Sequence, residues 1–214
     1  MSVPALLVDV QRRLESLYAL EPEAPVSEFL LSAQEADAYP GGGSRTLVAR
    51  DGDTVSLGVV LDPDVGARLS ERDPRVQLDG HNLDSFCAAT EEVSHFVYLL
   101  FCARTERTVT QLELELQAEV DKYLCAAFLL SLQNEGAVST RLRGLLFHDS
   151  RIADTVSEER AERYRAASQL AYRYCRFLEA RFLRPSRVAE LARESRRFYR
   201  LGQREKLEKI ARLQ

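Results

Sequence analysis

Apolar residues recur at steps of three and four along most of this chain, the spacing that gathers them on one face of an α-helix. The first such pattern covers residues 4–20, and its apolar positions are Leu6, Val10, Leu14, Leu17 and Leu20. From about residue 83 onward every periodic segment has the same helical spacing. The pattern predicts further helices over residues 84–103, 110–133, 139–147, 157–182, 186–200 and 203–212.

A different pattern, the alternation of apolar and polar residues, runs through residues 45–61. It surrounds Asp51-Gly52, a dipeptide typical of tight hairpin turns, so we predict a β-hairpin with one buried face. The alternating apolar positions are Val55, Leu57, Val59 and Leu61. Because a helical majority follows this small hairpin, the order of elements predicts a mostly helical α+β fold: a small β-hairpin or sheet, then a helix pair, then a C-terminal helical extension.

Length and composition favour one folded unit. The chain has 214 residues, enough for one sizeable core, and no Gly/Ser-rich or Pro-rich linker. We expect an α+β core over residues 1–150, with the helix pair at 84–133, and a basic helical extension over residues 151–214 packed on it. With 45% hydrophobic and 29% charged residues the composition is that of a soluble protein. Neither a membrane span nor a secretory signal is predicted, so the expected location is the cytoplasm.

Charge divides the chain into two opposite parts. Residues 141–214 hold 19 of the 29 Lys and Arg but 10 of the 33 Asp and Glu, a net charge of +9, whereas residues 1–140 carry −13. The basic part can lie against the acidic part of its own chain, or it can bind an acidic protein partner or a second copy of the chain. Nucleic acid is the less favoured alternative, and no membrane contact is predicted. The residues expected to hold a partner are Arg193, Arg196, Arg197 and Arg200.

Polar residues interrupt the apolar pattern of the helix pair. Glu91 and His95 lie one turn apart on a side of the first helix that is otherwise largely uncharged, so they can pair with each other or bind a common ion. On the second helix, Glu115 and Glu119 are also four residues apart, at the edge of the apolar stripe. If the two helices pack antiparallel, these four side chains and Glu92 can form one cluster.

Two other acidic residues of the second helix, Glu113 and Asp121, project away from this edge. We expect both to be solvated. The four cysteines lie inside apolar helical patterns without CxxC spacing, which is typical of reduced core cysteines.

The spacing of the clustered residues resembles that of gluzincins, the thermolysin-like zinc peptidases. In that family a helix with the motif His-Glu-x-x-His precedes a helix that supplies a glutamate ligand about 20 residues later. Here residues 91–95 read Glu-Glu-Val-Ser-His, Glu115 follows His95 by twenty positions, and Glu119 follows one turn later. A strand hairpin before the first helix is also a feature of that fold.

The resemblance implies a role for each residue. His95 and Glu115 would be metal ligands with Glu91 in the place of the first histidine, Glu92 would be the general base, and Glu119 would orient a ligand. Because Glu91 replaces a histidine, the ligand set is richer in oxygen and suits Mn or Fe(II) as well as Zn. The implied cofactor is one divalent metal ion.

Two classes of function remain open. The first is a zincin-like protein, either a divergent metal-dependent hydrolase of peptidase type or a catalytically inactive derivative that acts through protein interaction. The second is a non-enzymatic scaffold, in which His95 and Glu91 pair inside the core and the Arg-rich C-terminal helices bind an acidic partner or nucleic acid. The two classes differ in whether the purified protein holds a metal ion.

Overall fold

The structure is a computed structural model that describes residues 2–52, 54–139, 141–147 and 158–213. The first part of the chain contains α1 (Val3–Tyr18), η1 (Val26–Phe29), α2 (Ala33–Ala36), β1 (Arg45–Asp51), β2 (Thr54–Val60) and α3 (Pro63–Glu71). The helical part contains α4 (Leu83–Arg104), α5 (Gln111–Gln133), α6 (Leu142–Phe147), α7 (Glu158–Leu178), the π-helical turn η2 (Glu179–Leu183), α8 (Val188–Arg200) and α9 (Gln203–Ala211). The predicted mostly helical α+β fold is confirmed.

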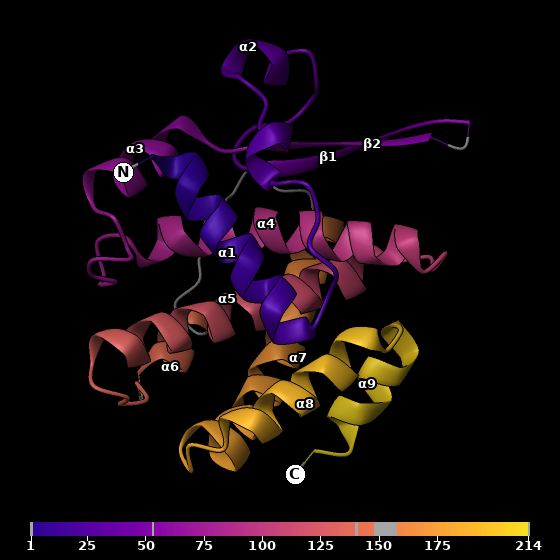
Figure 1. Cartoon of the computed structure of the whole chain (residues 1–214). Helices are drawn as coiled ribbons and strands as arrows, with labels where there is room; N and C mark the ends of the chain where they lie inside the picture. The colour runs from indigo at the N-terminus through magenta and orange to yellow at the C-terminus, as the bar shows by residue number, and fades with distance from the viewer. Residues whose placement is uncertain (1, 53, 140, 148–157, 214) are drawn as a thin grey trace.

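Helices α4 and α5 cross the middle of the molecule and run antiparallel (Figure 1). Late residues of α4 meet early residues of α5, since Tyr98 donates a hydrogen bond to Glu113, whereas the earlier Glu91 accepts one from Lys122. Helix α5 begins where Thr110 accepts a hydrogen bond from the backbone N–H of Glu113, a common N-terminal cap. The predicted helix pair is therefore present, and its two helices are joined by a short connection.

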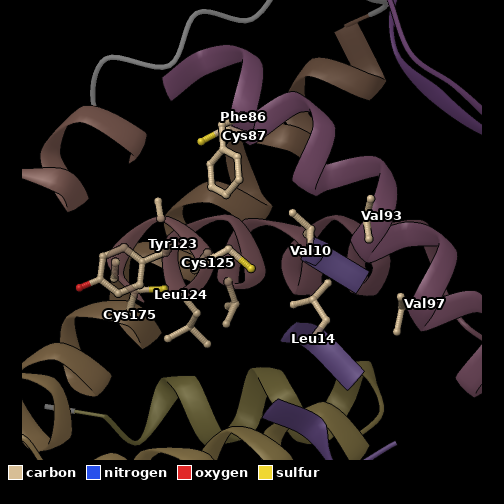
Figure 2. Close-up of a cluster of buried hydrophobic side chains, with 14 of the residues drawn as sticks. Val10, Leu14, Phe86, Cys87, Val93, Val97, Tyr123, Leu124, Cys125 and Cys175 are labelled. Atoms are coloured by element: carbon tan, nitrogen blue, oxygen red, sulfur yellow. The ribbon is translucent and has the colours of Figure 1, made fainter. Parts of the chain in front are cut away.

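One hydrophobic core joins α1, α4 and α5 to the C-terminal helices. Figure 2 shows side chains of α1, α4, α5 and α7 gathered in this core. The C-terminal helices supply buried residues to the same core, among them Ala171, Cys175, Leu178, Leu191, Phe198 and Ile210. All four cysteines are buried and free, as predicted. The expected domain boundary between residues 150 and 151 lies outside the described residues.

The hairpin is buried only at its base. Strands β1 and β2 pair antiparallel, with Thr46 opposite Val59 and Arg50 opposite Val55. Val59 is fully buried, but Val55 is 49% exposed, because the hairpin extends past the helical body on one side (Figure 1). The alternation predicted one continuous buried face, and the structure restricts that face to the half of the hairpin nearest α4.

Helix α4 is long and apolar enough to cross a membrane by length and composition, and 67% of its most apolar window is buried inside the fold. The core helix of a soluble protein passes the same test. Its burial against α1, α3 and α5 accounts for its apolar composition, which makes a soluble protein plausible.

Candidate metal centre

Glu91 and His95 of α4 meet Glu115 of α5. Each residue offers one ligand atom, and the three atoms lie within 4.8 Å of one another. Glu91 and His95 share a face because four residues make about one helical turn, and the antiparallel packing brings Glu115 beside them. The sequence predicted this grouping, and the structure brings all three side chains together.

The imidazole of His95 is the centre of the group. Its Nε2 atom is buried, lies 3.5 Å from Oε2 of Glu115 and makes no hydrogen bond within the described residues. Its Nδ1 atom lies 3.7 Å from Oε2 of Glu92. Burial lowers the pKa of His95, but the neighbouring carboxylates of Glu115, Glu92 and Glu91 outweigh burial and raise the pKa to about 10. Without a metal ion the ring therefore carries a proton.

Glu92 lies on the other side of the ring from Glu115. Its carboxylate faces Nδ1 of His95 and accepts a hydrogen bond of 2.8 Å from the hydroxyl of Thr46 on β1. It is buried and is not one of the three grouped ligand atoms. A carboxylate in this position can fix the orientation of a metal-binding imidazole. The predicted role of Glu92 as a general base stays a prediction.

Glu119 forms an ion pair with Lys122, a residue that the sequence analysis did not single out. Lys122 donates hydrogen bonds of 2.7 Å to Glu119 and 2.8 Å to Glu91. Burial lowers the pKa of Lys122, but the two carboxylates outweigh burial and raise the pKa well above its usual value, so the ammonium group stays charged. A signal for Lys122 was present, because it lies three and seven residues after Glu119 and Glu115, on the same face of α5.

These six residues are here called the Glu91 cluster: Glu91, Glu92, His95, Glu115, Glu119 and Lys122. The cluster holds four acidic groups and two basic ones, His95 and Lys122, in a mostly buried place. Arg160 of α7 lies close enough for Glu115 and Glu91 to raise its pKa, after the larger effect of its hydrogen bond to Tyr164. The excess of negative charge favours uptake of a cation.

The geometry of the group fits a divalent ion after a small closure. Bonds of about 2.0 to 2.2 Å place neighbouring ligand atoms about 3 to 3.5 Å apart around Zn. Because the three ligand atoms lie within 4.8 Å of one another, the side chains need to move inward by about 1 Å, a change that rotation about side-chain bonds supplies. Two carboxylates and one imidazole form a ligand set that suits Mn or Fe(II) as well as Zn.

A second buried polar group occupies the other side of α4 and α5. Glu113 and Asp121 were predicted to be solvated, and this prediction is wrong, since both are buried. Their carboxylates are enclosed by α1, α4, α9 and the connection before α5, and donors from those elements replace water. These residues are here called the Lys206 network: Tyr18, Ser94, Tyr98, Arg107, Glu113, Gln117, Asp121 and Lys206.

Lys206 of α9 is fully buried at the centre of this network. Its Nζ atom donates hydrogen bonds of 2.8 Å to Tyr98 and to Gln117. Gln117 donates in turn to Asp121, and Tyr98 donates to Glu113. Glu113, Gln117 and Asp121 follow each other at four-residue steps, which is a sequence signal for one polar face along α5.

The four arginines predicted to bind a partner divide into two pairs. Arg196 and Arg200 donate to backbone carbonyls at the C-terminal end of α1, with a hydrogen bond of 2.8 Å from Arg196 to Leu17. Arg193 and Arg197 are exposed and have no ion pair or hydrogen bond with any residue that the structure describes. Half of the predicted contact surface thus serves the fold itself.

No protein-family model, curated protein or solved structure matches this chain. The gluzincin resemblance therefore depends on the spacing of the cluster residues, and a zincin core remains a prediction.

Proposed function

We propose that this protein binds one divalent metal ion through Glu91, His95 and Glu115. The observation that carries the proposal is the Nε2 atom of His95, which is buried, makes no hydrogen bond within the described residues and faces Glu115. The 3.5 Å ion pair with Glu115 is longer than a good hydrogen bond, and a cation bound between the two side chains would give both ligand atoms a closer partner.

The other residues of the cluster support this role. Glu92 would hold the ring of His95 through its Nδ1 side, as carboxylates commonly do behind metal-binding histidines. The metal would replace the proton of His95, so its binding releases that proton. When bound, the ion would act as a Lewis acid toward an oxygen-containing ligand.

Metal analysis of protein prepared without chelator or metal-affinity resin tests the proposal. We expect about one Zn, Mn or Fe ion per chain, and a loss of metal affinity of at least about 100-fold on His95→Ala or Glu115→Ala with the fold retained. His81→Ala is the matched control, because His81 is exposed and lies outside the cluster. Metal-free wild-type protein, or equal metal loss in the control, would contradict the proposal.

A hydrolase of peptidase type is the narrower form of this proposal. It requires Glu92 to activate water, whereas the contact with Nδ1 of His95 favours an orienting role. Glu92→Gln separates the two: a general base would lose turnover with metal content unchanged, and an orienting residue would lose metal affinity. The measurement is metal content beside hydrolysis of a mixed peptide substrate.

Partner binding through the Arg-rich helices is a second candidate function, favoured by the exposed and unpaired Arg193 and Arg197. We expect binding to an acidic protein surface or to a second copy that weakens at high salt. Arg193→Glu with Arg197→Glu should abolish it, and Arg204→Glu serves as a control because Arg204 pairs with Glu208. The cytoplasm stays the predicted location.

A further inference from the structure

A surface groove lies where α1 passes α5 and α8. It has a volume of about 710 Å³ and is lined by α1 from Asp9 onward, by the C-terminal half of α5, and by Val188 at the start of α8. The C-terminal end of α1 lies beside α8 (Figure 1), and Arg196 of α8 donates hydrogen bonds to the backbone carbonyls of Leu17 and Ser16. These bonds join two walls of the hollow, which is here called the α1 groove.

Most of the α1 groove is apolar. Its apolar side chains come from all three helices: Leu14, Leu17, Cys125, Phe128, Leu132 and Val188. Leu14 is fully buried at the floor, whereas Leu132 is 71% exposed and Val188 is 61% exposed. Large apolar side chains that stay exposed beside a hollow are typical of a surface that binds another molecule.

Two arginines of α1 line the same groove without a carboxylate partner. Arg12 and Arg13 are exposed, and neither makes an ion pair or a hydrogen bond within the described ranges of the chain. The one acidic residue of the lining, Asp9, is already compensated, because its carboxylate lies 2.7 Å from the guanidinium group of Arg75. An occupant of the groove therefore meets positive charge beside an apolar surface, so complementary charge on the occupant is negative.

The exposed edges of the groove favour a helix over a small anionic molecule. A pocket for a small ligand encloses most of the ligand, whereas Leu132 and Val188 stand largely in solvent on two different helices. An α-helix is about 10 Å wide and presents apolar side chains on one stripe, which can cover the floor and both exposed side chains together. Acidic residues beside that stripe would face Arg12 and Arg13.

From this arrangement we propose that the α1 groove binds an amphipathic helix of another protein, in which acidic residues flank the apolar stripe. The stripe covers Leu132 and Val188, and the acidic residues pair with Arg12 and Arg13. The inference uses no residue of the Glu91 cluster and neither of the two unpaired arginines of α8. It therefore goes beyond the proposed function and does not depend on it.

Fluorescence anisotropy with model peptides tests the inference. The probe is a labelled helix-forming peptide with one stripe of leucines flanked by glutamates, and a matched probe has lysines in place of the glutamates. Each probe is held at trace concentration while the protein is added up to about 0.5 mM. We expect saturable binding of the acidic probe that weakens at high salt, and binding of the basic probe that is at least about tenfold weaker.

Charge reversal in the groove tests the role of the arginines. Arg12→Glu with Arg13→Glu should weaken binding of the acidic probe at least about tenfold and strengthen binding of the basic probe. The matched control is Arg204→Glu with Arg212→Glu, which makes the same change of charge at two exposed positions of α9 and its end that do not line the groove. The control should bind both probes as the wild type does.

A second set of variants tests the apolar contact. Leu132→Asp and Val188→Asp should each weaken binding of the acidic probe at least about tenfold, and both should fold, because the two side chains are largely exposed. Val48→Asp is the control, since Val48 is 55% exposed on the hairpin and does not line the groove. Circular dichroism checks the fold of every variant.

The outcomes separate this inference from the proposed functions. No saturable binding of the acidic probe, or unchanged binding in the folded groove variants, overturns the inference. Loss of binding only in Arg193→Glu with Arg197→Glu overturns it as well, because the contact would then lie on α8. Calorimetric binding of dodecanoate without binding of the acidic probe overturns the helix as occupant. Removal of metal by a chelator should leave probe binding unchanged.

Discussion

Helices α4 and α5 carry two buried polar groups, the Glu91 cluster and the Lys206 network, in which the buried charges are compensated differently. In the Lys206 network, Glu113 and Asp121 are matched by Arg107 and Lys206, and apart from Nε of Arg107 its buried side-chain atoms have hydrogen-bond partners. In the Glu91 cluster the carboxylates outnumber the cations, and Nε2 of His95 has no hydrogen-bond partner among the described residues.

This difference indicates a structural role for the Lys206 network and a binding role for the Glu91 cluster. In the Lys206 network the charges are balanced and both carboxylates accept hydrogen bonds, so its role is to hold α9 against α4 and α5. In the Glu91 cluster the acidic groups outnumber the basic ones, and the imidazole lies 3.5 Å or more from its carboxylate neighbours, a combination that is expected at a binding site. The comparison predicts that the two groups respond oppositely to mutation and to pH.

The largest effect is expected in the Lys206 network. Glu113→Ala leaves the half-buried Arg107 and the buried Lys206 without the nearby carboxylate, so the free energy of unfolding should fall by about 3 to 5 kcal/mol. Urea unfolding followed by circular dichroism measures this. Glu35→Ala is the control: it removes only exposed hydrogen bonds to Ser32, so it should lower the free energy of unfolding much less than Glu113→Ala does. A loss below about 1 kcal/mol in Glu113→Ala would show that the network is not structural.

The two groups should also differ in the sign of their pH dependence. The raised pKa of His95, about 10, means that its stabilising effect is complete below its unfolded pKa near 6.5 and is lost as pH rises through 10. Burial lowers the pKa of Lys206 to about 7, so its contribution is present above its unfolded pKa near 10.5 and is lost as pH falls through 7.

Unfolding of metal-free variants between pH 7 and pH 10 measures this difference. As pH rises from 7 to 10, the free energy of unfolding of the wild type relative to that of His95→Gln should fall by about 1 to 3 kcal/mol. Over the same range, the free energy of unfolding of the wild type relative to that of Lys206→Met should rise by about 1 to 3 kcal/mol. The same sign for both variants would break the comparison.

A smaller effect is expected for loss of a carboxylate in the Glu91 cluster. Glu115→Gln should change the free energy of unfolding of the metal-free protein by about 1 kcal/mol or less, because it reduces an excess of negative charge while His95 keeps Glu92 and Glu91 nearby. The same variant should lose metal affinity. A destabilisation as large as that of Glu113→Ala would instead indicate a structural ion pair.

The smallest effect concerns the arginines of α8. Arg196→Ala frees backbone carbonyls at the end of α1 and should cost about 1 kcal/mol, whereas Arg193→Ala should cost about zero. Thermal unfolding of the two variants side by side measures the difference. Equal values would mean that the contacts of Arg196 do not stabilise α1.

The sequence determined the elements of this protein and the candidate site. Periodic apolar residues located the helices, Asp51-Gly52 located the hairpin turn, and the spacing of Glu91 and His95 placed them on one face. These features depend on residues a few positions apart, where helical and strand geometry fixes the relation between side chains.

Only the tertiary structure decided which charged residues are buried and what they contact. Glu113 and Asp121 seemed solvated along the chain because some of their donors are far away in sequence: the backbone N–H of Gln203 bonds to Glu113, and the hydroxyl of Tyr18 bonds to Asp121. The spacing placed Lys122 on the same face of α5 as Glu115 and Glu119, but its contact with Glu91 exists only where α4 and α5 meet. The free energy of a buried charge depends on donors and cations supplied by distant segments, and spacing within one helix does not contain that information.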